Sequence, residues 1–366
     1  MIFVNTESMS GTWQAFERLV CRYLVYRNFE GVRVVGTSGD KGADIIAHKD
    51  KKRWLFQVKQ WSRRAGAAEV EKTVKALSFY SADIPVVICR GGFDQFAHQA
   101  RDRFHAQQTL CQLWNADDLL RRGKKITPNS YPPQSEQHHQ TRPYQETAIK
   151  RLIEEYNSDH NNRAMIVMAT GLGKTRVMCE FVKRISIVKH HYLPKILVLA
   201  HTNDLVYQLE RAFWPYLHAN QQTAVWNGLE KQNYKSIKRT NVTFACLNTV
   251  AHYSKINGML PDFHVVLVDE CHHVGDEGMY QEVLDSLSAG ERGETFLTGV
   301  TATPWRPDEY DLKKKFGEPV ISMDLVAGLK NGFLANIDYR MFTTNLDWSK
   351  FSGNKNSKEK NFAQRH

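Results

Sequence analysis

The sequence predicts an α/β protein built from two units. The front unit is expected to form a mixed sheet flanked by helices, and the second unit a parallel sheet with helices on both faces. From Arg142 onward, short apolar runs of strand length alternate with amphipathic helical patterns, which is typical of a covered parallel sheet. Before that point strand and helix patterns are mixed. A polar stretch with three prolines, residues 124–141, separates the two.

The unit boundaries follow from these changes in composition. We expect a front unit at 1–123, a linker at 124–141, a second unit at 142–345 and a flexible tail at 346–366. The tail is rich in Lys, Asn and Ser and has no apolar periodicity. A chain of 366 residues is long enough for two domains, each with its own core.

Composition excludes several classes of protein. The longest apolar runs have the length of a strand, far short of a membrane span, and the N-terminus lacks the features of a secretory signal. The six cysteines are scattered without a C-x-x-C pair, which argues against a disulfide framework or a zinc site. We therefore expect a cytoplasmic protein with no membrane partner.

The net charge of +10 is concentrated at the front of the chain. Residues 1–125 contain 21 Lys and Arg against 13 Asp and Glu, a net charge of +8, and the remainder carries +2. A basic front unit suits a polyanion such as DNA. A solvated basic surface explains the same charge equally well, so charge alone does not choose between them.

A helix and a β-hairpin are predicted in the front unit. One face of the helix carries apolar residues at the i, i+3, i+4, i+7 spacing: Trp13, Phe16, Leu19, Val20 and Tyr23. Further along, two strand patterns at 43–47 and 54–59 flank a polar tip, which indicates a hairpin.

Polar side chains of this hairpin are expected to meet. If the turn centres near residues 50–52, Asp44 lies opposite Gln57 and Lys59, which share a face because they are two residues apart. Glu17 would reach in from the helix. Oxygen ligands suit Mg²⁺ or Mn²⁺, and Lys59 would add positive charge beside a scissile phosphate. Spacing alone nevertheless favours a solvated aspartate and an edge-strand lysine without a metal.

A Gly-rich loop follows the first apolar strand of the second unit, residues 164–169. The loop reads Thr170-Gly171-Leu172-Gly173-Lys174-Thr175, and a helical pattern starts directly after it. This context is the one a phosphate-binding loop requires. Lys174 would neutralise the β- and γ-phosphates and Thr175 would bind Mg²⁺. The match to the strict pattern is partial, because Met168 occupies its first position.

A carboxylate pair stands at the end of a later apolar strand, residues 263–268. There Asp269 would hold Mg²⁺ and Glu270 would orient or deprotonate the attacking water. A third element, Thr301-Ala302-Thr303, follows another strand. Three such elements in this order, each at a strand end, predict an ATP-hydrolysing site.

With these motifs the second unit resembles the first RecA-like domain of superfamily 2 helicases, and is similar to the motor subunits of type I and type III restriction enzymes. The family's phosphate loop M-A-T-G-x-G-K-T starts at Met168 here, and its DECH box is 269–272. The resemblance implies that Arg142 and Gln145 belong to the adenine-recognition motif, with Gln145 reading the base. It also implies DNA-contacting segments near 197–208 and 244–249. Motors of this family need a second RecA-like domain, which we expect in cis or in a partner chain.

The front unit resembles the Mrr-type catalytic domain of the PD-(D/E)xK nucleases. The residues that carry the resemblance are Phe16-Glu17, the run Gly39-Asp40-Lys41-Gly42-Ala43-Asp44, and Gln57-Val58-Lys59. It implies a restriction-endonuclease-like fold in which Asp44, Gln57 and Lys59 are catalytic, Glu17 assists, and Asp44 and Gln57 bind the metal.

Together the two resemblances imply an ATP-dependent DNA translocase fused to a metal-dependent DNA endonuclease, in restriction or anti-phage defence. The expected cofactors are ATP and Mg²⁺, with Mn²⁺ as a substitute at the nuclease site. Two alternatives stay open. The front unit could grip DNA without cutting it, or nucleotide occupancy could act as a switch for assembly with a partner.

Overall fold

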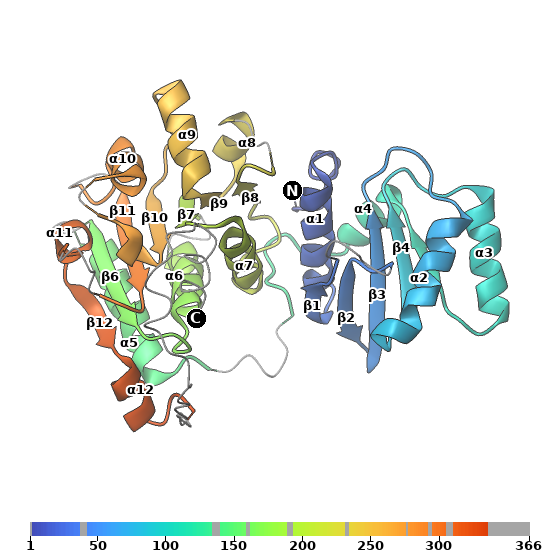
Figure 1. Ribbon diagram of the computed structural model, residues 1–366, viewed down its shortest axis with the longest axis horizontal. Coiled ribbons are helices and arrows are strands. Elements are labelled where there is room, and N and C mark those ends of the chain that lie inside the picture. The colour runs from blue at the N-terminus through green and yellow to red at the C-terminus, as the bar shows by residue number, and fades with distance from the viewer. Residues whose placement is uncertain are drawn as a thin grey trace, which may run out of the picture.

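The computed structural model describes residues 2–36, 42–133, 140–158, 162–188, 193–230, 234–275, 277–291, 295–304 and 310–335. The predicted tail at 346–366, the end of the second unit and the run Gly39–Lys41 lie outside these residues. Two α/β bodies lie next to each other, each built around one sheet (Figure 1).

The front body contains a five-stranded mixed sheet in the order β1-β2-β3-β4-β5. Its first three strands run antiparallel, whereas β3, β4 and β5 run parallel. The strands are β1 (Glu30–Val34), β2 (Ile45–Lys49), β3 (Lys52–Lys59), β4 (Ile84–Cys89) and β5 (Gln112–Trp114). The turn between β2 and β3 consists of Asp50 and Lys51, both with positive φ, as in the two-residue turns that suit the twist of a hairpin.

Four helices cover this sheet, namely α1 (Trp13–Tyr26), α2 (Ala67–Tyr80), α3 (Gln95–Ala106) and α4 (Ala116–Gly123). α1 packs with the strands in the largest core of the front body. α2 packs against the sheet in two smaller clusters, and α3 contributes to one of them. Thr12 caps α1 by accepting a hydrogen bond from the amide of Ala15. The predicted helix face is buried except at its first residue, since Trp13 is 62% exposed.

The second body contains a seven-stranded sheet in the order β12-β6-β11-β10-β7-β9-β8. Every neighbouring pair of these strands is parallel. The strands are β6 (Arg163–Met168), β7 (Ile196–Ala200), β8 (Thr223–Trp226), β9 (Val242–Cys246), β10 (Val265–Asp269), β11 (Phe296–Thr301) and β12 (Pro319–Met323). Most of their residues are buried, as expected for a sheet that is covered on both faces.

Helices cover both faces of this sheet. One core forms with α5 (Pro143–Tyr156), α6 (Lys174–Val188), α7 (Asn203–Phe213) and the 3₁₀ turn η1 (Trp214–Tyr216). The opposite core forms with α8 (Tyr234–Arg239), α9 (Leu247–Asn257), the 3₁₀ turn η2 (Cys271–His273), α10 (Met279–Ser286) and α11 (Lys313–Phe316). A last helix, α12 (Leu325–Lys330), follows β12. Carboxyl ends of parallel strands share one edge of the sheet, so all motifs that follow these strands are brought to that edge.

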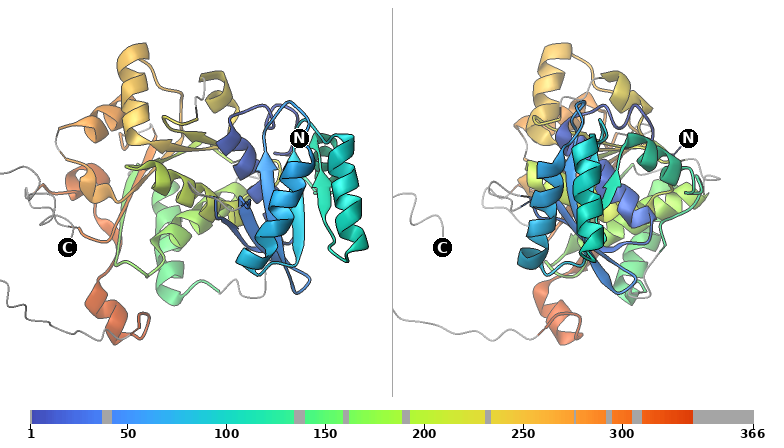
Figure 2. Two further views of the ribbon diagram at one scale, coloured as in Figure 1. Left: turned by 45° about the vertical axis from the view of Figure 1, so that its right-hand side comes forward. Right: turned by 90° about the vertical axis from the view of Figure 1, so that its right-hand side faces the viewer.

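The two bodies meet where α1 lies beside α7 and η1 (Figures 1 and 2). The first part of the predicted linker lies along the second body. There the amides of Ala219 and Asn220 donate to the carbonyl oxygens of Ser130 and Pro128 over 3.1 and 2.9 Å. The boundaries of the linker remain a prediction.

The predicted fold class is confirmed by the mixed front sheet and the all-parallel second sheet. All six cysteines are free and buried. Within the described ranges, no helix combines the length and apolar character needed to cross a bilayer.

Candidate functional site

The β2–β3 hairpin brings the predicted cluster together at one end of β3. Its register pairs Ile45 with Phe56, the residues next to Asp44 and Gln57, and the Asp44 amide donates to the Phe56 carbonyl oxygen over 2.8 Å. The Asp44 carboxylate accepts a 2.6 Å hydrogen bond from the Val58 amide, and Lys59 Nζ lies 3.7 Å from the same oxygen. The juxtaposition expected from the turn is therefore present, while the catalytic roles of these side chains stay predictions.

Glu17 extends this cluster from α1. Burial and then the negative charge of Asp44 raise the pKa of Glu17 from 4.5 to about 7. The positive charges of Arg211, Lys59 and Arg18 act in the opposite direction. Glu17 is thus within electrostatic range of the hairpin cluster and also of Arg211, a residue of the second body.

The oxygen atoms of this cluster suit a hard divalent cation. Gln57 is 1% exposed, and its Oε1 accepts a 2.7 Å hydrogen bond from the Thr73 hydroxyl, which orients the amide. When a second carboxylate raises the pKa of a carboxyl group, a cation near both groups stabilises the ionised form. No group of three His, Cys, Asp or Glu side chains able to hold a metal occurs in the described part of the chain. A metal here would use Asp44, Glu17 and the amide of Gln57, with water as the remaining ligands.

The loop that follows β3 adds aromatic and cationic side chains beside Lys59. Its Nζ lies 6.0 Å from the ring centroid of Trp61, and the guanidinium carbon of Arg63 lies 3.8 Å from the same centroid. Gln60 donates a 2.8 Å hydrogen bond to the carbonyl oxygen of Gly11, just before α1. Stacked aromatic and guanidinium groups of this kind contact bases and phosphates in nucleic-acid complexes.

The Gly-rich loop connects β6 to α6 as the sequence predicts. Gly171 and Gly173 have φ angles of +84° and +87°, in the region that favours glycine. A Cβ atom on Gly173 would lie 2.5 Å from Nε2 of Gln145. The loop ends at Lys174, the first residue of α6, so the N-terminal amides of a 15-residue helix are available to a phosphate.

The predicted carboxylate pair faces this loop from the end of β10. Asp269 is the last residue of that strand, and Glu270 follows in the left-handed conformation with φ of +50°. Burial and then the charge of Glu270 raise the pKa of Asp269 from 3.8 to about 6, against the opposing charge of Lys174. Lys174 Nζ lies 3.5 Å from Glu270 Oε1. The structure therefore brings Lys174 and both carboxylates to one place.

The end of β11 joins this site through a histidine. His272 Nδ1 lies 3.2 Å from Glu270 Oε2 and 3.0 Å from Thr301 Oγ1. The Thr301 hydroxyl also accepts a 3.1 Å hydrogen bond from the Thr303 amide. The carboxylate motif and the Thr-Ala-Thr motif are thus linked by one chain of contacts.

Gln145, the expected reader of adenine, is engaged with the phosphate loop. It is 4% exposed; its Nε2 donates to the Leu172 carbonyl oxygen over 2.8 Å, and its Oε1 accepts a 3.0 Å hydrogen bond from the Arg142 amide. Arg142 Nη1 in turn donates to the carbonyl oxygen of Phe333 over 2.9 Å. In this arrangement Gln145 supports the loop, and its contact with the base remains a prediction.

Sequence reasoning missed the residues that join the two bodies. Arg18 of α1 contacts Glu210 and Glu230, which are 192 and 212 residues away in the chain. The available signal was that α1 carries two arginines four residues apart, Arg18 and Arg22, among mostly apolar residues.

Comparisons with known proteins agree with this two-part organisation. Residues 8–122 match the family model described as restriction endonuclease, Mrr_cat, and residues 138–306 match the model described as type III restriction enzyme, res subunit, ResIII. The chain is 29% identical over 217 residues to the type I restriction enzyme EcoAI endonuclease subunit of Escherichia coli, covering 56% of this chain and 24% of that protein. It is 26% identical over 206 residues to the DNA 3′-5′ translocase XPB2 of Sulfurisphaera tokodaii, covering 56% and 40%.

Among solved structures, the type ISP restriction-modification enzyme LlaBIII bound to DNA aligns with 89% of this chain and 24% of its own, at 14% identity and a TM-score of 0.43. The match spans 24% of the length of the EcoAI subunit and 40% of the length of XPB2.

The folds and sites define a nuclease-like domain joined to a P-loop ATPase domain. The chain carries a restriction-endonuclease domain of the Mrr type followed by a ResIII helicase domain, and it is homologous to the endonuclease subunit of a type I restriction enzyme. These two families generally use ATP and a divalent metal. Below, the two parts are called the nuclease domain and the motor domain.

Proposed function

We propose that this protein hydrolyses ATP to move along DNA and cuts DNA with its nuclease domain, as part of a restriction or anti-phage defence system. The observation that carries the proposal is that the fold brings together two separate clusters of charged and polar side chains, one in each domain. One is the cluster of Asp44, Gln57 and Lys59, and the other is the meeting of Lys174 with Asp269 and Glu270.

At the motor site the side chains divide the work of ATP hydrolysis. Lys174 neutralises charge on the β- and γ-phosphates, which the amides of the glycine loop also contact. Thr175 and Asp269 would hold Mg²⁺, which would supply positive charge to neutralise the charge that develops on the phosphates. Glu270 accepts a proton from, or orients, the attacking water. In the structure Glu270 contacts Lys174 and His272.

At the nuclease site the cation, when bound, supplies Lewis-acid stabilisation of the phosphoryl oxygen and a more acidic water. Asp44, Gln57 and Glu17 would hold it. Lys59 places a positive charge beside Asp44, where it can stabilise the negative charge that develops on the scissile phosphate. Trp61 and Arg63 lie beside Lys59 and offer contacts to the DNA strand.

Two variants test the proposal independently. Lys59→Ala should lower metal-dependent DNA cleavage about a hundredfold or more, because it removes a positively charged group from the reacting phosphate. Lys174→Ala should remove ATP binding, measured with a fluorescent nucleotide. Cleavage that is unchanged in Lys59→Ala would favour a front domain that only grips DNA.

The matched control for Lys59→Ala is Lys52→Ala, since Lys52 is an exposed residue at the other end of β3. Cleavage by this variant should equal that of the parent protein. The nucleotide-switch alternative predicts that ATP affinity does not depend on DNA, so titrating ATP with and without DNA separates it from a motor.

The finer parts of the proposal follow the same reasoning. We take Mg²⁺ to be the cation at both sites, with Mn²⁺ able to replace it at the nuclease site, because the donors are oxygen atoms. DNA is the proposed partner, and a second motor domain, in cis or in another chain, would complete the ATP site. The free, buried cysteines support a reducing compartment such as the cytoplasm.

A further inference from the structure

The helix α1 packs in the core of the nuclease domain and also contacts the motor domain. Its apolar residues pack in the core of the nuclease domain, and the same cluster contains Trp214 and Ala219 of the motor domain. The amide of Phe3, which precedes α1, donates to the carbonyl oxygen of Ala219 over 2.9 Å. The position of α1 is therefore determined by contacts with the motor domain as well as by its own sheet.

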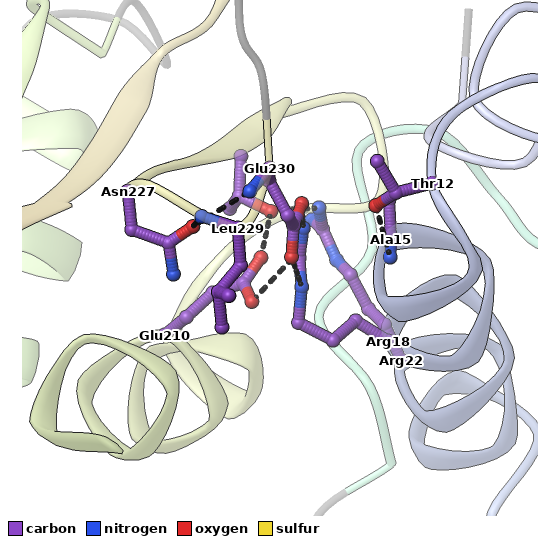
Figure 3. A network of polar contacts seen from close by, with 9 residues as sticks. Thr12, Ala15, Arg18, Arg22, Glu210, Asn227, Leu229 and Glu230 are labelled. Carbon is purple, nitrogen blue, oxygen red and sulfur yellow. Dashed lines mark hydrogen bonds and ion pairs between the residues drawn. The ribbon is translucent and has the colours of Figure 1, made fainter. Parts of the chain in front are cut away.

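Arg18 forms the centre of this interface (Figure 3). Its Nη1 donates to Glu210 Oε2 over 2.6 Å and its Nε donates to Glu230 Oε1 over 2.9 Å, and Nη2 also binds Glu230. Both carboxylate side chains are 1% exposed. Burial alone would lower the pKa of Arg18, but the two carboxylates outweigh this effect and raise it. One guanidinium group thus holds two buried carboxylates from separate segments of the motor domain.

A second arginine of α1 makes a different set of contacts one turn further on. Arg22 Nη2 donates to the carbonyl oxygen of Gln221 over 2.7 Å, and Nη1 donates to the Thr223 hydroxyl over 3.3 Å. Arg22 is 3% exposed. It is therefore as deeply placed in the interface as Arg18, but it binds mainly backbone oxygen atoms and is not among the charges that act most strongly on Glu17.

Two consecutive residues of α1, Glu17 and Arg18, interact with different domains. Arg18 binds Glu210 of α7, while its neighbour Glu17 is within electrostatic range of Asp44 and Lys59 in the nuclease site. Arg211, the residue after Glu210, also acts on Glu17. Its Nε atom is buried and makes no hydrogen bond in the described part of the chain. Glu210 of α7 therefore lies against Arg18 of α1, and their neighbours in the chain, Arg211 and Glu17, also carry opposite charges.

The other end of α7 lies at the motor site. Thr202 caps this helix, and the preceding residue, His201, is within electrostatic range of Asp269. The ring centroids of His201 and His273 are 4.6 Å apart. The helix α7 thus runs from the ATP site to the residue pair that contacts α1. Glu210 lies seven residues beyond the first residue of α7, a length of about 10 Å at 1.5 Å per residue.

We propose that Arg18 is a positioning residue through which the motor domain holds Glu17 at the nuclease site. The hydrogen bonds of Arg18 to Glu210 and Glu230 fix α1 against the motor domain. Phe16, the residue before Glu17, packs in one cluster with Ile45 and Phe56, the strand residues next to Asp44 and Gln57. The helix α1 thereby places Glu17 at this end of the hairpin. The nuclease site is then complete only when the two domains are docked. This inference rests on the proposed metal-dependent nuclease function.

The test measures metal binding directly and does not require cleavage. Mn²⁺ is titrated into the nucleotide-free full chain and free Mn²⁺ is followed by electron paramagnetic resonance. The binding event that Asp44→Asn abolishes reports the nuclease site. Arg18→Lys keeps the charge but cannot bridge two carboxylates with a planar fork. It should weaken this event about tenfold, as expected when the support of a metal ligand is lost.

Arg22→Lys is the matched control, because it makes the same replacement on the same helix and in the same interface. It should lower the melting temperature to a similar extent and leave Mn²⁺ affinity within twofold of the parent. Glu210→Gln, which keeps its shape and a hydrogen-bond acceptor, is the milder variant if Arg18→Lys does not fold. It should weaken Mn²⁺ binding about threefold, less than for the complete loss of an outer-shell partner, because Glu230 still binds Arg18.

Equal Mn²⁺ affinity in the parent and in Arg18→Lys, or equal weakening in Arg18→Lys and Arg22→Lys, would overturn the positioning role. DNA cleavage is then measured with the same proteins. A parent that binds Mn²⁺ through Asp44 but does not cut DNA would refute the proposed nuclease and leave the positioning role standing. A parent without any Mn²⁺ binding that depends on Asp44 would refute both.

Discussion

The Nδ1 atom of His272 lies 3.0 Å from the hydroxyl oxygen of Thr301. The two residues follow neighbouring parallel strands, β10 and β11, and the same imidazole nitrogen lies 3.2 Å from Glu270. If Glu270 changes its charge during ATP hydrolysis, as proposed, the change would reach the Thr-Ala-Thr motif through the single side chain of His272.

This contact predicts the behaviour of Thr301→Val, which keeps the shape of the side chain and removes the hydroxyl. We expect ATP affinity without DNA to change less than the affinity measured with DNA, so that the coupling between the two ligands falls about fivefold, within the usual range of coupling energies. The measurement is a titration of a non-hydrolysable ATP analogue with and without duplex DNA. Thr240→Val, which also removes a threonine hydroxyl but away from this contact, should keep the coupling of the parent. Full coupling in Thr301→Val would contradict the role of the hydroxyl.

A methyl group at Gly173 should disable the phosphate loop. The Cβ of an alanine there would lie 2.5 Å from the side-chain nitrogen Nε2 of Gln145. The φ of +87° at residue 173 also disfavours any residue except glycine. We expect Gly173→Ala to lower ATP affinity at least tenfold and to destabilise the fold by more than about 1 kcal/mol. Calorimetry of nucleotide binding and thermal unfolding measure the two effects.

Gly228 provides the control for this change. A Cβ there would meet no atom within 4 Å. Gly228→Ala should therefore bind ATP like the parent, with a change in stability within about 0.5 kcal/mol. If both alanine variants bind ATP normally, the close approach of Gln145 to the loop does not constrain residue 173.

The pKa of Glu17 predicts a pH-dependent stability. Because it rises from 4.5 in the unfolded chain to about 7 in the fold, the unfolded state releases this proton first as the pH increases. The stabilising contribution of the proton is complete below pH 4.5 and is lost as the pH rises through about 7. The loss amounts to about 3 kcal/mol at most, at 1.4 kcal/mol for each pH unit.

Glu17→Gln removes this titration. In the absence of divalent metal, the variant should be more stable than the parent at pH 8, and the difference should vanish near pH 4.5. Urea unfolding at both pH values measures it. A difference that is the same at both would show that Glu17 does not titrate in this range. Added Mg²⁺ should stabilise the parent at pH 8 and not the variant, because a cation favours the ionised carboxylate.

The loop beside Lys59 predicts a DNA-binding defect. Arg63 packs over the ring of Trp61 at 3.8 Å, so Trp61→Ala removes both an aromatic surface and the support of a cation. We expect DNA affinity to fall about tenfold, as for the loss of one stacked aromatic residue, measured by fluorescence anisotropy. Phe96→Ala is the control, since Phe96 is 57% exposed on α3. Equal loss in both variants would indicate that general exposed aromatic surface, and not this loop, binds DNA.

Much of each site is predictable because its residues are local in the sequence. The hairpin needs only a two-residue turn at Asp50 and Lys51 to place Asp44 opposite Gln57, and the phosphate loop needs only a strand, two glycines and a helix. Periodicity places Trp13 on the apolar face of α1 but does not show that it is 62% exposed, because it does not show where a helix extends past its core. Neither does it show that Gln145 would be buried against Leu172.

The sequence by itself determined the two α/β units, the phosphate loop, the carboxylate pair and the hairpin cluster, since strand alternation, helix periodicity and turn chemistry act over a few residues. Only the tertiary structure decided that His272 meets Thr301 and that Arg18 holds Glu210 and Glu230. These contacts depend on the order of strands in a sheet and on how two cores dock. Because the charges of Arg18, Glu210 and Glu230 are buried, each is stable only beside a charge of opposite sign. The residues near Arg18 in the chain nevertheless do not identify its partners.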